Sequence, residues 1–130
     1  MDGMRRTVGS GSPLEPRTGF SRAVPCGAHV AVAGTAPLGD DGSTVGPGDV
    51  HAQTVRCPDI AERALRDAGA SLEHVIRTRV ILTGVTRWEE AARAHGERFA
   101  TVRPATTFVG VSRFIDPARL VEVEVDAVVT

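Results

Sequence analysis

Three carboxylates alternate with small apolar residues near the end of the chain. Glu122, Glu124 and Asp126 occupy every second position. The positions between and beside them are apolar, namely Val121, Val123, Val125, Ala127 and Val129. This period of two predicts a strand over Leu120–Val129 with one buried face and one acidic face. Carboxylates can transfer protons in a catalytic site, but a row of three on one face also needs positive partners.

A second predicted strand, Val75–Thr83, supplies candidate partners for the acidic face. Its alternation places Arg77 and Arg79 on one face together with Ile81. The opposite face is expected to carry Ile76, Thr78, Val80 and Leu82. If the two strands are neighbours, ion pairs between them neutralise the acidic row. We favour this structural interpretation over a catalytic role for the whole row.

Other residue types that support catalysis lack the partners they need. Thr106 and Thr107 act as nucleophiles only beside a base, and the sequence places none there. His95 stands alone in a predicted helix, where a packed or surface role is favoured over catalysis. Cys26 and Cys57 form no CxxC pair and have no histidine at metal-ligand spacing, so we expect reduced cysteines and no metal site. The chain contains no lysine, which excludes a Schiff base on a lysine side chain.

Length and charge indicate one domain, residues 1–130, of which 1–19 are partly loop. The 130 residues carry a formal net charge of −1, from 15 basic and 16 acidic side chains, and only 4% of them are aromatic. A nucleic-acid surface needs a basic stripe or stacking aromatic side chains, and neither is visible. No segment approaches the roughly 20 apolar residues of a membrane span. We therefore expect a cytoplasmic protein with no nucleic-acid or membrane partner.

The first half of the chain reads as a hairpin, a polar connection and a helix. Met4–Val8 is predicted as a short strand, Gly9–Gly19 as a loop, and Phe20–Val24 and His29–Gly34 as strands joined by a turn at Pro25–Gly27. After the polar connection Thr35–Gly48, Asp49 is the expected N-cap of a helix that runs to about Ala68 and is closed by Gly69. Pro58 lies inside this helix, so we expect a kink there or two shorter helices.

The second half supplies another helix and two more strands. Thr86 and Glu89 fit a capping box for a helix that ends near Phe99 and buries Trp88, Ala91, Ala92 and Phe99. The run Thr106–Val111 and the acidic strand flank a turn at Asp116-Pro117. These elements predict an α+β fold, with two helices packed on one face of a mixed β-sheet. The other face is expected to stay uncovered and to carry several valines, which favours self-association.

Five segments in this order resemble a known family. They are Phe20–Ala23, Val32–Pro37, Gln53-Thr54, Val80–Thr83, and the pattern Pro104-Ala105-x-x-x-Val109-x-Val111 followed by the acidic alternation. Together they cover nearly the whole chain and resemble the reactive intermediate deaminase family, called Rid or YjgF. The resemblance implies the YjgF-like, chorismate-mutase-like fold and a homotrimer with small-metabolite pockets at the subunit interfaces. It also implies enamine or imine deaminase activity without a cofactor.

The resemblance also implies roles for individual residues. Glu124 would orient water or move a proton, and the backbone near Gly34 and near Thr107 and Phe108 would complete the substrate pocket. Phe20 stands where an aromatic hydroxyl is frequent. Thr106 stands where imine-hydrolysing members carry the arginine that binds the substrate carboxylate.

Because that arginine is missing, two classes of function stay open. Arg22, on the hairpin that borders the implied pocket, is a candidate substitute for the anchor. The first class is a Rid-type hydrolase with an altered substrate, such as one without the α-carboxylate. The second is a trimer that binds a small metabolite without catalysis. The ribonuclease label sometimes attached to the family has no support in the charge pattern.

Overall fold

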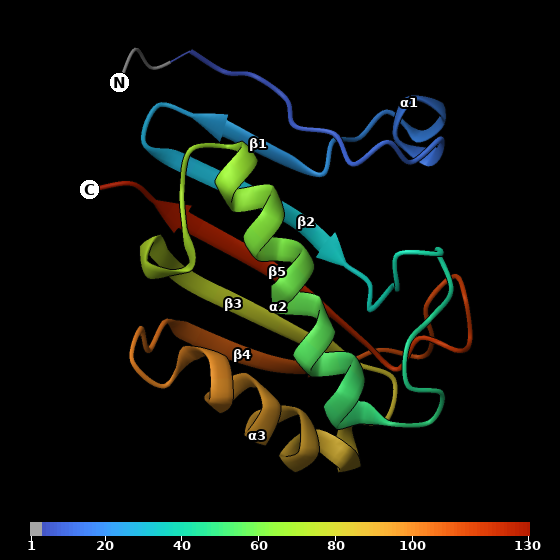
Figure 1. The fold of residues 1–130 in the computed structure, drawn as a ribbon. Helices are drawn as coiled ribbons and strands as arrows, with labels where there is room; N and C mark the ends of the chain where they lie inside the picture. Colours follow the sequence, from blue (N-terminus) through green and yellow to red (C-terminus); the bar gives the residue numbers. More distant parts are fainter. Residues whose placement is uncertain (1–3) are drawn as a thin grey trace.

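A computed structural model describes residues 4–130, which form a mixed sheet with its two long helices on one face (Figure 1). The sheet has five strands in the order β1-β2-β5-β3-β4. Neighbouring strands are antiparallel except β3 and β4, which are parallel. Both helices lie against the same face of the sheet, and α2 crosses β2 and β5. The α+β class and the arrangement of two helices on one face of a mixed sheet are therefore confirmed.

The N-terminal hairpin is shifted from its predicted bounds. Strands β1 and β2 span Ala23–Cys26 and His29–Thr35, and the turn between them is at Gly27, whose φ is 60°. The turn predicted at Pro25–Gly27 is wrong because Pro25 and Cys26 still pair with β2. The segment predicted as a strand, Met4–Val8, contributes only two isolated bridges to β1. The predicted loop Gly9–Gly19 contains a short helix, α1 (Leu14–Thr18), which ends at Gly19 with a φ of 81°.

Helix α2 spans Val50–Asp67 and has the predicted ends. The Asp49 side chain accepts a hydrogen bond from the amide of Ala52 at 2.9 Å, and Gly69 follows the helix with a φ of 89°. Pro58 does not divide the helix, so the prediction of two shorter helices is wrong. The Pro58 ring is buried. The free energy gained by burying this ring offsets part of the cost of losing the hydrogen bond to the carbonyl of Thr54.

Replacing Pro58 with alanine is expected to leave the free energy of unfolding unchanged or raised by up to about 1 kcal/mol. The change restores a helical amide and relieves a proline penalty of about 3 kcal/mol, but it loses the burial of two to three methylenes at about 0.8 kcal/mol each. Urea denaturation measures the difference. Arg63→Pro, at an exposed position of the same helix, is the control and should lose about 3 kcal/mol. A loss above about 2 kcal/mol in Pro58→Ala would contradict this account.

Strands β3 (Val75–Leu82) and β5 (Val121–Val128) form the centre of the sheet, and β4 (Ala105–Gly110) forms one edge. Three valines of β5, Val121, Val123 and Val125, face the helices and are buried, as its alternation predicts, whereas Val128 is only partly buried. Ile76 was expected to share the buried face of β3, but it is 50% exposed. The pairing between β3 and β5 shifts between Val75 and Arg77. This irregularity buries Val75 in place of Ile76.

Helix α3 spans Trp88–Phe99 and follows a 3-10 turn at Val85–Arg87. The predicted capping box is wrong because Thr86 lies within the 3-10 turn and no side chain caps the helix. The helix buries Ala91, Ala94 and Phe99. Trp88 is 46% exposed rather than buried, and Ala92 is only partly buried.

The sheet face opposite the helices is open in the protomer and is not the valine-rich surface that we expected. Its central strands present Arg77, Arg79, Glu122, Glu124 and Asp126. The edge strand β4 adds Thr107 and Val109. Since Val121, Val123 and Val125 are turned to the core, the open face offers mainly charged side chains, and its apolar residues include Ile81 beside Val109.

Candidate functional site

The acidic row of β5 faces the arginines of β3, as predicted. Arg79 lies opposite Glu124 and forms an ion pair with it, in which Nη1 donates to Oε1. Arg77 lies opposite Asp126, and the Nε2 atom of His29 is 3.8 Å from the Asp126 carboxylate. The structural role of the row is thus confirmed for the Arg79–Glu124 pair. Both side chains remain about 40% exposed, so they are accessible from the open face.

Glu122 has different surroundings from Glu124. Its Oε1 atom would lie 2.9 Å from a Cβ atom at Gly34, so only glycine allows this close approach without a shift. Arg119 Nη1 is 3.8 Å from the other carboxylate oxygen. Burial raises the pKa of Glu122, while Arg119 and Arg22 oppose that rise and Glu124 adds to it. Sequence reasoning grouped Glu122 with the rest of the row and missed this distinction, because the approach depends on an irregularity in the pairing of β2 with β5.

Three of the predicted binding residues meet beside Glu122. Arg22 Nη2 donates to the Gly34 carbonyl at 2.9 Å, and its guanidinium carbon lies 6.0 Å from the centre of the Phe20 ring. The Nε atom of Arg22 is buried and has no hydrogen-bond partner within residues 4–130. Burial lowers the pKa of Arg22, against the opposing effect of Glu15 and Glu122. The structure therefore joins Phe20, Arg22 and Gly34 in one cluster next to a carboxylate.

Thr106 lies elsewhere, on the helix-covered face of β4. Its hydroxyl is 2.8 Å from the hydroxyl of Thr78 and donates to the Pro104 carbonyl at 3.0 Å. Thr78 is fully buried, and its hydroxyl is also 2.8 Å from His95 Nε2. His95 stacks on Phe99 with 4.6 Å between ring centroids, and burial lowers the pKa of the imidazole. This network agrees with a packed rather than catalytic His95.

Phe108 and Thr107 complete the predicted set on β4. The Phe108 ring lies on the helix side, 6.0 Å from the Trp88 ring and 6.2 Å from the His95 ring. Thr107 is exposed on the open face, where it is the register partner of Arg79.

Within one protomer, the predicted site residues fall into separate groups. Phe20, Arg22 and Gly34 belong to the β1–β2 side of the sheet, Glu124 lies on β5, and Thr106 lies on β4 at the opposite edge. Thr106 and Glu124 also point to opposite faces of the sheet. A single chain therefore does not bring Thr106 and Glu124 into one pocket.

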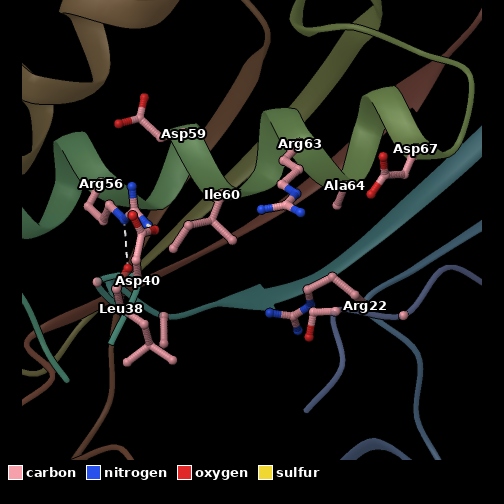
Figure 2. Close-up of a pocket in the computed structure, with 13 residues that line it drawn as sticks. Arg22, Leu38, Asp40, Arg56, Asp59, Ile60, Arg63, Ala64 and Asp67 are labelled. Atoms are coloured by element: carbon pink, nitrogen blue, oxygen red, sulfur yellow. Dashed lines mark hydrogen bonds and ion pairs between the residues drawn. The ribbon is translucent and has the colours of Figure 1, made fainter. Parts of the chain in front are cut away.

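A cavity of about 440 Å³ lies on the helix side, between α2 and the segments 9–10 and 36–40 (Figure 2). Of the predicted site residues, only Arg22 lines it. Across residues 4–130, the His, Cys, Asp and Glu side chains form no group of three that could hold a metal ion. In that same part of the chain, every helix is too short or too polar to cross a membrane.

The raised pKa of Glu122 predicts a pH effect on stability. Because the folded state holds the proton more tightly than the unfolded state, stability contributed by this group is greatest at low pH. It is lost as the pH rises from the unfolded carboxyl pKa, about 4.3, through the higher folded value. Glu122→Gln should flatten this part of the stability profile and be at least as stable as wild type at pH 8. Thermal unfolding across pH 4–8 tests this, with exposed Glu89→Gln as the control, and an unchanged slope in Glu122→Gln would contradict it.

Comparisons with known proteins agree with the fold. A family model described as Endoribonuclease L-PSP matches residues 11–129. An uncharacterized protein of Streptomyces coelicolor is 45% identical over 122 residues, which cover 94% of this chain and 90% of that protein. A RutC family protein of Pyrococcus abyssi is 31% identical over 101 residues, covering 78% and 77% of the two chains.

A solved structure from Mycobacterium tuberculosis shows the same fold over its whole length. Rv2704, described as a member of the YjgF/YER057c/UK114 family, superposes with a TM-score of 0.87 at 43% identity, covering 97% of this chain and 100% of that one. The matched segment includes the β1–β2 hairpin, α2 and the acidic strand β5, which carry the sequence motifs. The chain therefore belongs to the YjgF/YER057c/UK114 family, also called the Rid family.

Proposed function

We propose that the protein is a homotrimer whose small-metabolite pockets form between neighbouring subunits. The observation that carries this proposal is the separation of Thr106, on the edge strand β4, from Glu124 on the central strand β5 and from Gly34 on β2. A head-to-tail contact that joins the β4 edge of one protomer to the β1–β2 side of the next closes a ring of three when three successive rotations make a full turn. Thr106 and Phe108 of one subunit would then face Phe20, Gly34 and Glu124 of its neighbour.

The chemistry we assign to this pocket is hydrolysis of an imine or enamine of a small metabolite. Water adds to the carbon of the C=N bond, the C–N bond then breaks, and the amine leaves with a proton. Glu124 is accessible on the open face and is held in place by Arg79, which suits a base that orients the water. Burial raises the pKa of Glu122, two residues away, which suits a group that carries a proton to the leaving amine.

The substrate of this pocket is proposed to differ from that of the arginine-containing relatives. Thr106 offers a hydroxyl that is already bonded to Thr78 and Pro104, and it cannot provide the bidentate contact of a guanidinium. We infer a substrate without an α-carboxylate, or one whose carboxylate binds Arg22. In the second case the under-satisfied guanidinium of Arg22, next to Gly34, supplies the anchor.

A second candidate function is metabolite binding without turnover. It is favoured because the two side chains central to the proposed hydrolysis already have partners. Glu124 is ion-paired with Arg79, and Thr106 is hydrogen-bonded to Thr78 on the helix side. The experiment that separates the two candidates offers the protein two kinds of imine generated in the assay. A flavin amine oxidase supplies imines without an α-carboxylate, and an amino-acid oxidase supplies 2-imino acids. Release of ammonia faster than in a buffer control supports hydrolysis. A rise in melting temperature with a substrate analogue, without turnover, supports binding alone.

The description of the family model as an endoribonuclease raises a third activity, which the charge distribution does not favour. A ribonuclease surface needs an excess of cationic or stacking side chains, whereas this chain has a net charge of −1 and 4% aromatic residues. The arginines of the open face are opposed by carboxylates on β5. We therefore place hydrolysis of a small metabolite ahead of RNA cleavage.

A further inference from the structure

The cavity beside α2 has the size and lining of a small-molecule site. Its volume of about 440 Å³ falls within the range of ligand pockets, roughly 300–1,000 Å³. Leu38, Ile60 and Ala64 supply an apolar part of its wall. The cavity lies on the helix side of the sheet, whereas Glu124 lies on the open face. Of the residues assigned to the catalytic pocket, Arg22 is the one that also lines this cavity, so the two sites differ in their other residues.

Most of the charged groups around the cavity are already neutralised. Asp40 is 3.3 Å from Arg56, whose Nε also donates to the Leu38 carbonyl at 2.6 Å. Asp59 is ion-paired with Arg98, which comes from α3. These pairs fix the rim of the cavity and leave no free charge at its Asp40 end.

Arg63 and Asp67 are different, because neither side chain has an ion pair within residues 4–130. They lie one turn apart on α2 and both line the cavity, with Arg22 on the opposite wall (Figure 2). A cation that precedes an anion by four residues is the less favourable order for a pair within a helix. Both groups therefore stay available to a ligand, at a spacing of about 5–6 Å between Cβ atoms.

We propose that this cavity binds a small aliphatic α-amino acid in its zwitterionic form. The carboxylate contacts Arg63, the ammonium group contacts Asp67, and the aliphatic side chain lies against Leu38, Ile60 and Ala64. The carboxylate and ammonium of an α-amino acid are close enough together to contact both residues at once. Phosphates and dicarboxylates are disfavoured, because Asp67 lines the same space without an ion pair among residues 4–130 and repels a second negative charge.

The test uses L-leucine as the probe and the complete protein as the receptor. Titration calorimetry and NMR of methyl groups should show millimolar binding, with Ile60 among the shifted signals. 4-Methylpentanoate lacks the ammonium group and 3-methylbutylamine lacks the carboxylate, so each should bind at least about fivefold more weakly. Arg63→Gln and Asp67→Asn should each weaken leucine binding by about tenfold, as expected for loss of a charge-assisted contact. Arg66→Gln removes an exposed arginine of the same helix that pairs with Glu62 at 3.1 Å, and it should bind leucine as wild type does.

Three results would overturn the proposal. They are no leucine binding at tens of millimolar, equal affinity for leucine and 4-methylpentanoate, and unchanged affinity in Arg63→Gln. The outcome is independent of the proposed hydrolase. Thr106→Arg and Glu124→Gln, which alter the interface pocket, should leave leucine affinity unchanged, whereas Arg63→Gln should leave imine turnover unchanged.

Discussion

Wild-type protein is expected to hydrolyse short 2-imino acids about thirty- to a thousandfold more slowly than relatives with arginine after the Pro-Ala pair. A bidentate, charge-assisted contact to the substrate carboxylate is worth roughly 2–4 kcal/mol in a partly dry pocket, and Thr106 cannot make it. Thr106→Arg should recover part of this factor in kcat/KM. Adding Glu124→Gln to that variant should abolish the gain. Steady-state ammonia release from imines generated in the assay measures all three proteins.

The control for added charge is Thr107→Arg. Thr107 adjoins Thr106 but lies on the open face of β4. An arginine at this position therefore places its guanidinium on the opposite face of the sheet. It should give no comparable gain. A wild-type rate equal to that of arginine-containing relatives would contradict the account and point to Arg22 as the anchor. A folded but inert Thr106→Arg protein would instead favour binding without catalysis.

The second large effect concerns assembly. We expect a particle of three times the 13.7 kDa chain mass at micromolar concentration, measured by sedimentation or light scattering. Val109 is 37% exposed on the open face of the edge strand β4, which the ring model places at a subunit contact. Val109→Arg should weaken assembly on the order of a hundredfold or more, because an unpaired guanidinium would be buried there.

Ile115→Arg is the matched control for this variant. Ile115 is 88% exposed and lies in the loop between β4 and β5, outside the strands that the ring model joins. The trimer should survive the added charge at this position. A wild-type protein that is monomeric at micromolar concentration, or a Val109→Arg protein that assembles normally, would refute the ring.

Local sequence patterns correctly predicted the elements whose structure depends mainly on the residues within them. The strict alternation of β5 is enough to turn Val123 and Val125 to the core, and Asp49 and Gly69 mark the ends of α2 through their own side-chain and backbone chemistry. The Arg79–Glu124 pair followed from matching two such alternations. These predictions needed no knowledge of distant contacts.

The failures occurred where a distant partner decides the structure. Ile76 is exposed because the pairing of β3 with β5 is irregular at that point. No feature of the β3 sequence predicts this irregularity. The close approach of Glu122 to Gly34 likewise depends on the irregular pairing of β2 with β5. Thr106 contacts Thr78 only because β3 and β4 pair in parallel across 28 residues of sequence.

The central claim is that one pocket takes residues from two subunits, and mixed trimers test it most directly. A subunit that carries both Thr106→Arg and Glu124→Gln has the arginine anchor but no base. A wild-type subunit has the base but no anchor. Co-expression with two different tags isolates trimers that contain both kinds. The account predicts that each such trimer has one complete pocket and about one third of the activity of the Thr106→Arg homotrimer. Mixed trimers as slow as the wild-type and double-variant homotrimers, beside an active Thr106→Arg homotrimer, would contradict it.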